Sequence, residues 1–367
     1  MISLYVHIPF CLRKCFYCSY SVAVNQDHLI GAYVSSLAKE IQANKNAAIK
    51  TVYFGGGTPS RIPFSQLERI VKAIRSAFDC GQVSEWTVEV NPEDVTMGFI
   101  QALLGLGVTR ISAGVQTFDR RRLQEIGRCH TPERVYEAYH CLRSAGCRNI
   151  SLDMMYGFPG QTHRDIADDV RELAAMSPEH VSLYNLSVEP RSCFFVRGVR
   201  PRSAAEQGAQ YSYVADLLQD EGYVQYEVSN FCRPGYASRH NRHYWRGGNY
   251  FGIGAAAHSH MDGHRWWNTD RLREYIKRGE TGEDPRTGEE RLDPQQRLSE
   301  ALVFGLRMLE GVNIKALEQK YQSALREEQK RSLDDLLDKQ FLLEEGGCIR
   351  VSRKGLLRLD MLSIELI

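Results

Sequence analysis

The sequence has no excess of charge of either sign. Its 46 Lys and Arg residues are balanced by 45 Asp and Glu residues, which leaves a formal net charge of +1. A protein that holds nucleic acid by its phosphates usually carries a basic stripe or patch. The composition therefore predicts no nucleic-acid partner.

Long apolar runs are also missing. A helix that spans a bilayer needs about 20 mostly apolar residues, and no stretch of this sequence reaches that length. The first residues lack the basic segment, apolar stretch and small-residue cleavage site that direct secretion. These absences predict a cytoplasmic protein without a transmembrane segment, with peripheral membrane contact left open. Ten cysteines in such a chain fit a reducing compartment.

Three of the cysteines stand close together near the start. Cys11, Cys15 and Cys18 follow directly on His7-Ile-Pro-Phe. A [4Fe–4S] cluster takes four ligands, so three thiolates leave one iron free to bind a small molecule. A structural zinc site is the alternative, but it needs a fourth ligand, and His7 is the one histidine in this loop. The spacing favours the iron–sulfur cluster, and the other seven cysteines are interpreted as small buried apolar residues.

Short apolar, β-branched runs alternate with longer helical patterns through the first half of the sequence. Such alternation is typical of a parallel sheet with helical crossovers. Six units predict an α/β fold, an incomplete (β/α)6 parallel barrel with a C-terminal α+β extension. The expected strands are Ser3–Ile8, Thr51–Phe54, Trp86–Val90, Arg110–Val115, Ile150–Met155 and His180–Leu186. The expected helices include Leu29–Ala43, Phe64–Phe78, Pro132–Ser144 and Thr162–Ala175.

Three regions are predicted along the chain. Residues 1–200 form the partial barrel, residues 201–280 an extension rich in aromatics, histidines and glycines, and residues 289–367 a small winged-helix-like domain. Thr281–Gly288 is polar and contains glycine, so it is predicted to be a linker. The last region is expected to hold helices at Gln295–Leu309, Ile314–Tyr321 and Ala324–Leu337, a hairpin at Phe341–Val351 and a final helix to about Leu362.

Unusual residues follow the ends of the expected strands. Parallel barrels carry their chemistry at the carboxyl ends of their strands, where the cysteine loop and the run Gly55-Gly-Gly-Thr-Pro both fall. Glycines let a ligand approach bare backbone, and Glu89 can accept a hydrogen bond from an ammonium. Gln116 and Asp153 can hold ribose hydroxyls, and Arg128 can pair with a carboxylate as a fork. Each of these four side chains alone is better explained by a surface salt bridge or a hydrogen bond at the end of a strand, but together they predict one pocket.

These motifs resemble a known superfamily. Cys-x3-Cys-x2-Cys after His-Ile-Pro-Phe, with Gly-Gly-Gly-Thr-Pro, Glu-Val-Asn-Pro, Gly-Val-Gln and Asp-x-Met-x-Gly-x-Pro, resembles the radical S-adenosylmethionine (SAM) superfamily. Within it the match is to the branch that contains oxygen-independent coproporphyrinogen III oxidase and the HemW heme chaperones. His240-Asn-Arg-His-Tyr-Trp resembles the His-Asn-x-x-Tyr-Trp motif of the chaperones, and Tyr20 stands where the oxidase has a further cysteine.

The resemblance implies two cofactors and the residues that hold them. Cys11, Cys15 and Cys18 would ligate a [4Fe–4S] cluster whose open iron is chelated by the amine and carboxylate of SAM. Tyr17 is expected either to lie over that iron or to pack in the core. The residues implied at the SAM site are Tyr5, Gly56, Gly57, Thr58, Glu89, Gln116, Arg128 and Asp153.

The resemblance also implies a function: a heme chaperone that binds heme and transfers it to acceptor proteins, respiratory ones among them. His240 is implied as an axial heme ligand, since imidazole often ligates heme iron, with His243 and His258 as competitors. No catalytic residue is predicted. Two other classes stay open: an enzyme that decarboxylates coproporphyrinogen III or modifies another tetrapyrrole, and a zinc-stabilised binding module. Productive cleavage of SAM and a homodimer also stay open.

Overall fold

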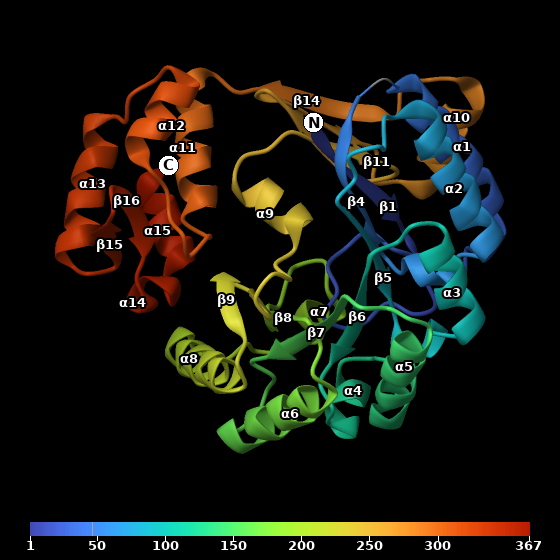
Figure 1. Cartoon of the computed structure of the whole chain (residues 1–367), viewed down its shortest axis with the longest axis horizontal. Helices are drawn as coiled ribbons and strands as arrows, with labels where there is room; N and C mark the ends of the chain where they lie inside the picture. Colours follow the sequence, from blue (N-terminus) through green and yellow to red (C-terminus); the bar gives the residue numbers. More distant parts are fainter. Residues whose placement is uncertain (46) are drawn as a thin grey trace.

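Seven parallel strands form the centre of the molecule (Figure 1). The computed structural model describes residues 1–45 and 47–367. Six of the strands are the predicted ones, and their bounds agree within two residues. They are β1 (Ile2–Ile8), β4 (Ile49–Gly56), β5 (Glu85–Val90), β6 (Arg110–Gln116), β7 (Ile150–Tyr156) and β8 (His180–Asn185). The seventh, β11 (Tyr250–Ile253), was not predicted, and it pairs with β1 from the C-terminal half of the chain.

The six strands of the N-terminal half alternate apolar and polar residues, and this alternation sets the two faces of the sheet. In β1, Leu4 and Val6 belong to the main hydrophobic core under the helices, whereas Ser3, Tyr5 and His7 lie on the opposite, inner face. The strand register places Tyr5 beside Tyr53 of β4. Parallel strands buried on both faces usually read as continuous apolar runs. The inner face of this barrel is polar instead, and it suits a polar ligand at its open end.

Helices cover the outer face of the sheet (Figure 1). Their buried residues, Leu37 of α1 and Ile70 of α2 among them, join the same core. The helices before the C-terminal region are α1 (Ile30–Ala43), α2 (Phe64–Ala77), α3 (Met97–Gly105), α4 (Arg120–Glu125), α5 (Pro132–Ser144), α6 (His163–Met176), α7 (Cys193–Val196), α8 (Ala204–Asp220), α9 (Arg239–Trp245) and α10 (Leu272–Thr281). A separate two-stranded piece, β2 (Phe10–Cys11) with β3 (Ala23–Val24), brackets the cysteine loop.

Antiparallel strands extend the parallel sheet at both edges, to twelve strands in all. They are β10 (Asn230–Cys232) and β9 (Val224–Glu227) at one edge, and β12 (His258–Met261), β13 (His264–Asn268) and β14 (Arg286–Arg291) at the other. The prediction of a linker at Thr281–Gly288 was wrong, because residues from Arg286 onward pair with β13. This edge strand is almost wholly exposed. Backbone hydrogen bonds to β13 hold this strand in the sheet, and its side chains face solvent. The sequence of the strand therefore shows no alternation of apolar and polar residues.

The C-terminal residues build a second hydrophobic core, which includes Leu298, Leu302, Leu342 and Leu366. Its elements are α11 (Pro294–Gly305), α12 (Ile314–Tyr321), α13 (Glu327–Asp338), β15 (Leu342–Glu345), β16 (Cys348–Val351), α14 (Arg353–Leu356) and α15 (Leu359–Leu366). The predicted helices and hairpin are present. The chain ends in two short helices, α14 and α15, where one was expected.

Helix α9 lies between this second core and the sheet (Figure 1). On the C-terminal side, Arg246 pairs with Glu310 at 2.7 Å, and the guanidinium of Arg307 lies 4.4 Å from the ring centre of Trp245. On the other side, His240 is buried against strand β4. One short helix therefore contacts both the C-terminal core and the interior of the barrel.

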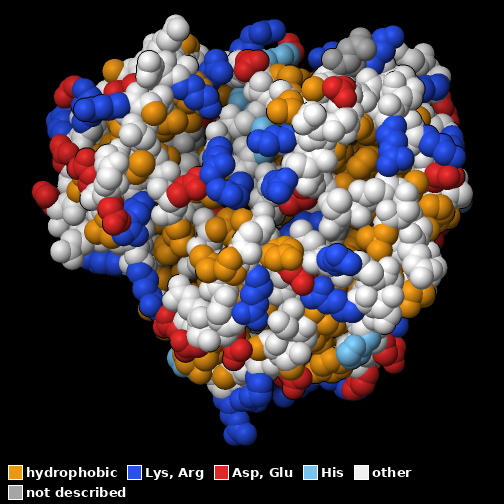
Figure 2. Space-filling view, in the orientation of Figure 1, with side chains coloured by type: hydrophobic (Ala, Val, Ile, Leu, Met, Phe, Trp, Pro, Cys, Tyr) orange, Lys and Arg blue, Asp and Glu red, His pale blue; other side chains and the backbone are white. Residues whose placement is uncertain are grey.

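The surface shows no face of one charge sign in the view of Figure 2, where basic and acidic side chains are interspersed. This distribution agrees with the balanced composition. Within residues 1–45 and 47–367, none of the helices combines the length and the apolar character that crossing a bilayer requires.

Candidate functional site

A cavity of about 360 Å³ opens at the carboxyl ends of the parallel strands. Its volume is in the range of small-molecule sites. All but two of the sequence-predicted site residues line it: Cys11, Cys15, Cys18, Gly56, Gly57, Thr58, Glu89, Gln116, Arg128 and Asp153. The structure thus brings together residues that are spread over more than a hundred positions of the sequence.

The three cysteines border the same end of this cavity. Cys11 ends strand β2, and its Sγ lies 3.4 Å from Oγ1 of Thr58. Burial raises the pKa of Cys11 to about 11 and also raises the pKa of Cys18. Without a metal these groups are therefore thiols, and a bound metal would favour their thiolate forms. In the part of the chain that the structure describes, no three His, Cys, Asp or Glu side chains are grouped closely enough to hold a single metal ion.

Only glycine fits at positions 56 and 57, because His7 and Pro9 pack directly against the backbone there. Gly56 has φ +111°, and a Cβ there would lie 2.5 Å from the ring of His7. A Cβ on Gly57 would lie 2.7 Å from the backbone carbonyl of Pro9. The neighbouring hydroxyl of Thr58 accepts a hydrogen bond from Nδ2 of Asn91 at 3.1 Å. Small residues at these positions let the strand end pack closely while its backbone borders the cavity.

Glu89 is a half-buried carboxylate held at both oxygens. The hydroxyl of Tyr53 donates to its Oε1 at 2.6 Å, and the backbone N–H of Gly56 donates to its Oε2 at 3.2 Å. Burial raises the pKa of Glu89 to about 7, against the lowering effect of the Tyr53 hydrogen bond. A cation placed beside it would favour the ionised form. Glu89 is therefore equipped to accept a proton or bind an ammonium near neutral pH.

Asp153 is held by hydroxyl groups. The Oγ of Ser112 lies 3.0 and 3.2 Å from its two carboxylate oxygens, and Ser151 donates at 3.3 Å. Burial raises the pKa of Asp153, while hydrogen bonds from Ser182 and Ser112 lower it. Ser112 lines the cavity beside it. A carboxylate fixed in this way can accept further hydrogen bonds from the hydroxyls of a ligand.

Arg128 joins the cysteine loop to two strands. Its Nη2 donates at 2.7 Å both to Oδ1 of Asn91 and to the carbonyl of Gly114, and its Nη1 lies 3.6 Å from Sγ of Cys15. Burial alone would lower the pKa of Arg128, but Tyr17, Cys15 and Glu93 raise it, so the guanidinium is charged. It gives the cavity a fixed positive charge beside the cysteines.

Two family models match the chain. The radical SAM superfamily model matches residues 5–173, and the HemN C-terminal domain model matches residues 292–358. The heme chaperone HemW of Lactococcus lactis is 36% identical over 357 residues, which cover 96% of this chain and 94% of that protein. The heme chaperone HemW of Bacillus subtilis is 32% identical over 364 residues, 97% of this chain and 96% of its own length. The chain belongs to the HemW family of radical SAM proteins.

A solved structure supports the fold assignment. Coproporphyrinogen III oxidase (HemN) from Escherichia coli superimposes with a TM-score of 0.88, covering 100% of this chain and 89% of that chain at 21% identity. At this identity the likeness concerns the fold alone. It confirms the predicted α/β class, with a parallel sheet of radical SAM type and a C-terminal extension.

Membership of the radical SAM superfamily implies a [4Fe–4S] cluster and SAM, and the cavity fits both. Its donor set at one end is sulfur from three cysteines, as iron–sulfur clusters require. The rest of the cavity offers a carboxylate for an ammonium, a guanidinium for a carboxylate and a second carboxylate for hydroxyls, provided by Glu89, Arg128 and Asp153. These are the polar groups that the amino-acid and ribose parts of SAM need.

Two predicted residues do not line the cavity of this HemW-family chain. The Tyr5 hydroxyl is hydrogen-bonded to Nδ1 of His7 at 3.0 Å, and its ring stacks on that of Tyr53. His240 is only 1% exposed, and burial lowers its pKa to about 3. Its Nδ1 is hydrogen-bonded to Oγ1 of Thr51 at 2.8 Å. Both side chains lie on the inner side of the barrel, behind the residues that face the cavity.

The two competing histidines differ in exposure. His243 is partly buried, and its Nε2 lies 2.8 Å from the carbonyl of Asn249. His258 is exposed on strand β12, where its ring stacks on Trp267 with ring centres 5.8 Å apart. Among these histidines, His258 is the most exposed and His240 the most buried.

Sequence reasoning missed several residues that line the cavity. Asn91 bridges Thr58 and Arg128, and its signal was present as the third residue of Glu-Val-Asn-Pro. Ser112 was detectable from the polar alternation of its strand. Tyr184 and Asn185, at the end of β8, carried no recognisable motif. Tyr17 packs against the small core that includes Phe158 and Phe194, as one of its two expectations had it. It also lines the cavity, and a position over the iron stays a prediction.

The remaining cysteines do not all behave as predicted. Cys147 and Cys232 are buried, but Cys129 is exposed and the other four are partly exposed. The prediction of buried apolar residues was therefore wrong for Cys129. Cys129 directly follows Arg128 in the sequence. The side chain of Arg128 points inward to Cys15, and that of Cys129 is exposed.

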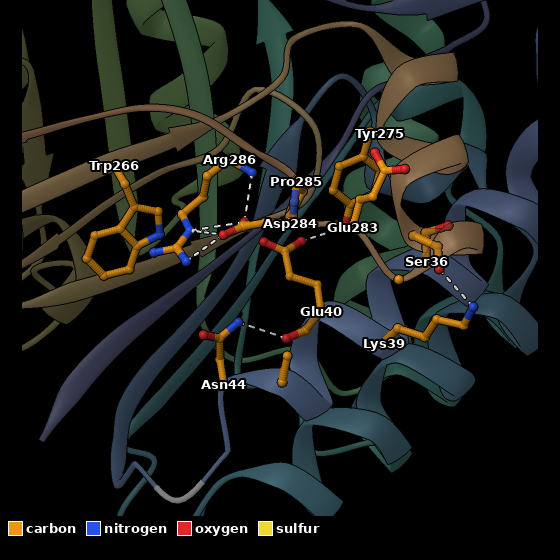
Figure 3. A pocket seen from close by; sticks show the side chains of 13 residues that line it. Ser36, Lys39, Glu40, Asn44, Trp266, Tyr275, Glu283, Asp284, Pro285 and Arg286 are labelled. Atoms are coloured by element: carbon orange, nitrogen blue, oxygen red, sulfur yellow. Dashed lines mark hydrogen bonds and ion pairs between the residues drawn. The ribbon is translucent and has the colours of Figure 1, made fainter.

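A second cavity, of about 450 Å³, lies between α1, α10 and β14 (Figure 3). Its polar groups bond to one another. Tyr275 and Asn268 donate to Glu40, Lys39 donates to the carbonyl of Gly279 at 2.7 Å, and Arg286 and Asp284 form an ion pair across from Glu40 (Figure 3). None of the predicted site residues lines it. Its larger volume does not make it the better candidate, because no cysteine in the described part of the chain borders it.

Proposed function

We propose that this chain is a heme chaperone: it binds heme and transfers it to acceptor proteins, with a [4Fe–4S] cluster and SAM as its cofactors. The observation that carries the proposal is the similarity to heme chaperones along the whole chain, 36% over 96% of its length in one case. The run His240 to Trp245 supports the same assignment. The cytoplasm is the proposed location, and respiratory proteins are candidate acceptors.

The residues of the cavity have separate roles in this proposal. Cys11, Cys15 and Cys18 would hold the cluster, which supplies an open iron for SAM and an electron for its reductive cleavage. The fork of Arg128 would orient the carboxylate of SAM, and Glu89 would accept from its ammonium.

The ribose end of SAM would lie against the later strands. Asp153 would accept hydrogen bonds from the ribose hydroxyls, and the amide of Gln116 would accept from them or donate to them. The backbone of Gly56, Gly57 and Thr58 would contact the methionine part. Gln116 has φ +71°, and this left-handed strand end places residue 116 on the lining of the cavity. Productive cleavage of SAM is a further proposal, and it rests on membership of the radical SAM superfamily.

One experiment separates chaperone from oxidase. The anaerobically reconstituted protein is titrated with heme and, in a parallel sample, incubated with coproporphyrinogen III, SAM and a reductant. The proposal expects a saturable change in the heme spectrum, transfer of that heme to an added apo-globin, and no protoporphyrinogen IX. Steady formation of protoporphyrinogen IX would establish the enzyme class instead. A flat heme titration would exclude the chaperone function.

The axial ligand needs a second experiment. The prediction that His240 ligates heme stays a prediction, and the burial of its ring adds a condition: helix α9 must move to uncover it. His258→Ala is the comparison for His240→Ala, because His258 is exposed beside Trp267. Loss of heme binding in His240→Ala alone would identify His240 as the axial ligand. Loss in His258→Ala alone would move the ligand to the exposed strand β12.

A further inference from the structure

Three stacked rings lie inside the barrel, behind the cavity. The ring of Tyr53 stacks on His240 with centres 5.0 Å apart and planes at 29°, and on Tyr5 with centres 6.2 Å apart and planes at 28°. We call Tyr5, Tyr53 and His240 the ring stack. The residues come from β1, β4 and α9, so an element of the C-terminal half completes a layer of the N-terminal barrel.

The His240 end of the ring stack is fixed from several sides. Its Nδ1 bonds to Thr51, and its backbone N–H donates to the buried carboxylate of Glu85 at 3.0 Å. The N–H of Arg239 donates to the same carboxylate, also at 3.0 Å. The ring of Tyr244 meets the imidazole edge-on, with centres 4.7 Å apart. His240 therefore offers Tyr53 a rigid surface.

The other end of Tyr53 reaches the functional cavity. Its hydroxyl donates to Oε1 of Glu89 at 2.6 Å, and Glu89 lines the cavity. Tyr53 does not line the cavity itself. A tyrosine ring can pivot about its Cα–Cβ bond, so the direction of the hydroxyl depends on what holds both faces of the ring. Here Tyr5 and His240 both stack against the ring of Tyr53.

We propose that His240 is a positioning residue for the SAM site: it fixes Tyr53, and Tyr53 fixes the Glu89 carboxylate that faces SAM. This inference rests on the proposed SAM site and assigns to the His-Asn-x-x-Tyr-Trp motif a role that does not require contact with heme. It also makes α9 the element through which the C-terminal half contributes to SAM binding.

The test compares two substitutions, each of which removes one contact of His240 and keeps the other. His240→Phe keeps a ring against Tyr53 and loses the bond to Thr51. His240→Asn keeps a polar atom near the place of Nδ1 and loses the ring. The affinity for SAM of the anaerobically reconstituted proteins is measured by calorimetric titration. We expect the dissociation constant to rise about ten-fold in His240→Asn, the size of one weakened charged hydrogen bond. We expect it to stay within about three-fold of the parent in His240→Phe.

A double-mutant cycle on SAM affinity shows whether His240 acts through Tyr53 or only through the general stability of the fold. Tyr53→Phe removes the hydroxyl that Glu89 accepts from, so it should weaken SAM binding by about as much as His240→Asn. If His240 acts through Tyr53, the double variant should be no weaker than either single one, because coupled effects are not additive. Should His240→Asn fail to fold, judged by iron content and melting temperature, His240→Gln takes its place as the ring-free variant.

The outcomes separate this inference from the proposed function. Unchanged SAM affinity in His240→Asn, or fully additive effects with Tyr53→Phe, would overturn the positioning role even if heme binding is lost. A weaker affinity in His240→Phe than in His240→Asn would also overturn it, since the bond to Thr51 would then matter more than the ring. A parent protein that binds no SAM at all would refute the cofactor assignment itself.

Discussion

Asp153→Asn is the sharpest test of the cavity. The substitution keeps the shape of the side chain and removes its charge and one acceptor oxygen. Ser112 and Ser151 fix the position of the Asp153 carboxylate, and in the proposed site it accepts hydrogen bonds from the hydroxyl pair of the ribose. Asparagine can accept one of two such bonds, and its amide donates where the second should be accepted. The variant should therefore lose one hydrogen bond to a charged group.

The size of the effect follows from that count. A hydrogen bond to a charged group is worth about 1.5–3 kcal/mol, which corresponds to a dissociation constant for SAM about 10 to 150 times higher. The fold should be little affected, because the hydroxyls of Ser112 and Ser151 can rotate to accept from the new amide. Iron content and melting temperature should then match the parent within error.

The assay is calorimetric titration of SAM into the anaerobically reconstituted protein. Asp168→Asn is the matched control, because Asp168 is about half exposed on helix α6 and pairs only with Arg171 at 2.8 Å. The control should bind SAM as the parent does. If Asp153→Asn also bound SAM with the parent's affinity at full iron content, the ribose would not lie on Asp153, and our reading of the cavity would be wrong.

Three further predictions concern the cluster, the fold and the glycine run. Cys18→Ala should lose most of its iron and visible absorption after reconstitution, whereas Cys129→Ala should keep both; full iron in the former would mean that the ligands are misassigned. Burial raises the pKa of Asp169 to about 7, so its folded form binds a proton more tightly than the unfolded chain does. The free energy of unfolding of the parent, relative to Asp169→Asn, should fall as pH rises from about 4 to 7, by up to about 1.4 kcal/mol per pH unit. A pH-independent difference in urea titrations would contradict this. Gly57→Ala should destabilise the protein by about 1–3 kcal/mol and weaken SAM binding, since the backbone carbonyl behind it lies 2.7 Å from the added methyl group. Gly98→Ala, with open space around its Cβ, should do neither.

The sequence by itself determined six of the seven parallel strands and ten of the residues that line the cavity. The carboxyl ends of neighbouring parallel strands must meet at one edge of the sheet, so polar residues placed after successive strands converge whatever the details of packing. Cys11, Gly56, Glu89 and Asp153 could therefore be assigned to one site from their positions alone. The alternation of polar and apolar residues in each strand also determined that the barrel would have a polar interior.

Only the tertiary structure decided which residues line the cavity and which lie behind it. Tyr5 was predicted at the SAM site and His240 as an axial heme ligand, and both lie behind the cavity in the ring stack. Their place depends on β11 joining β1 and on α9 entering the barrel. In these contacts Ser3 pairs with Tyr250, and Thr51 bonds to His240, 189 positions further along the chain. No local pattern encodes such contacts, because they arise when a distant segment fills space that the barrel leaves open. The edge strand β14 was hidden for a related reason: backbone pairing holds it, and its side chains remain in solvent.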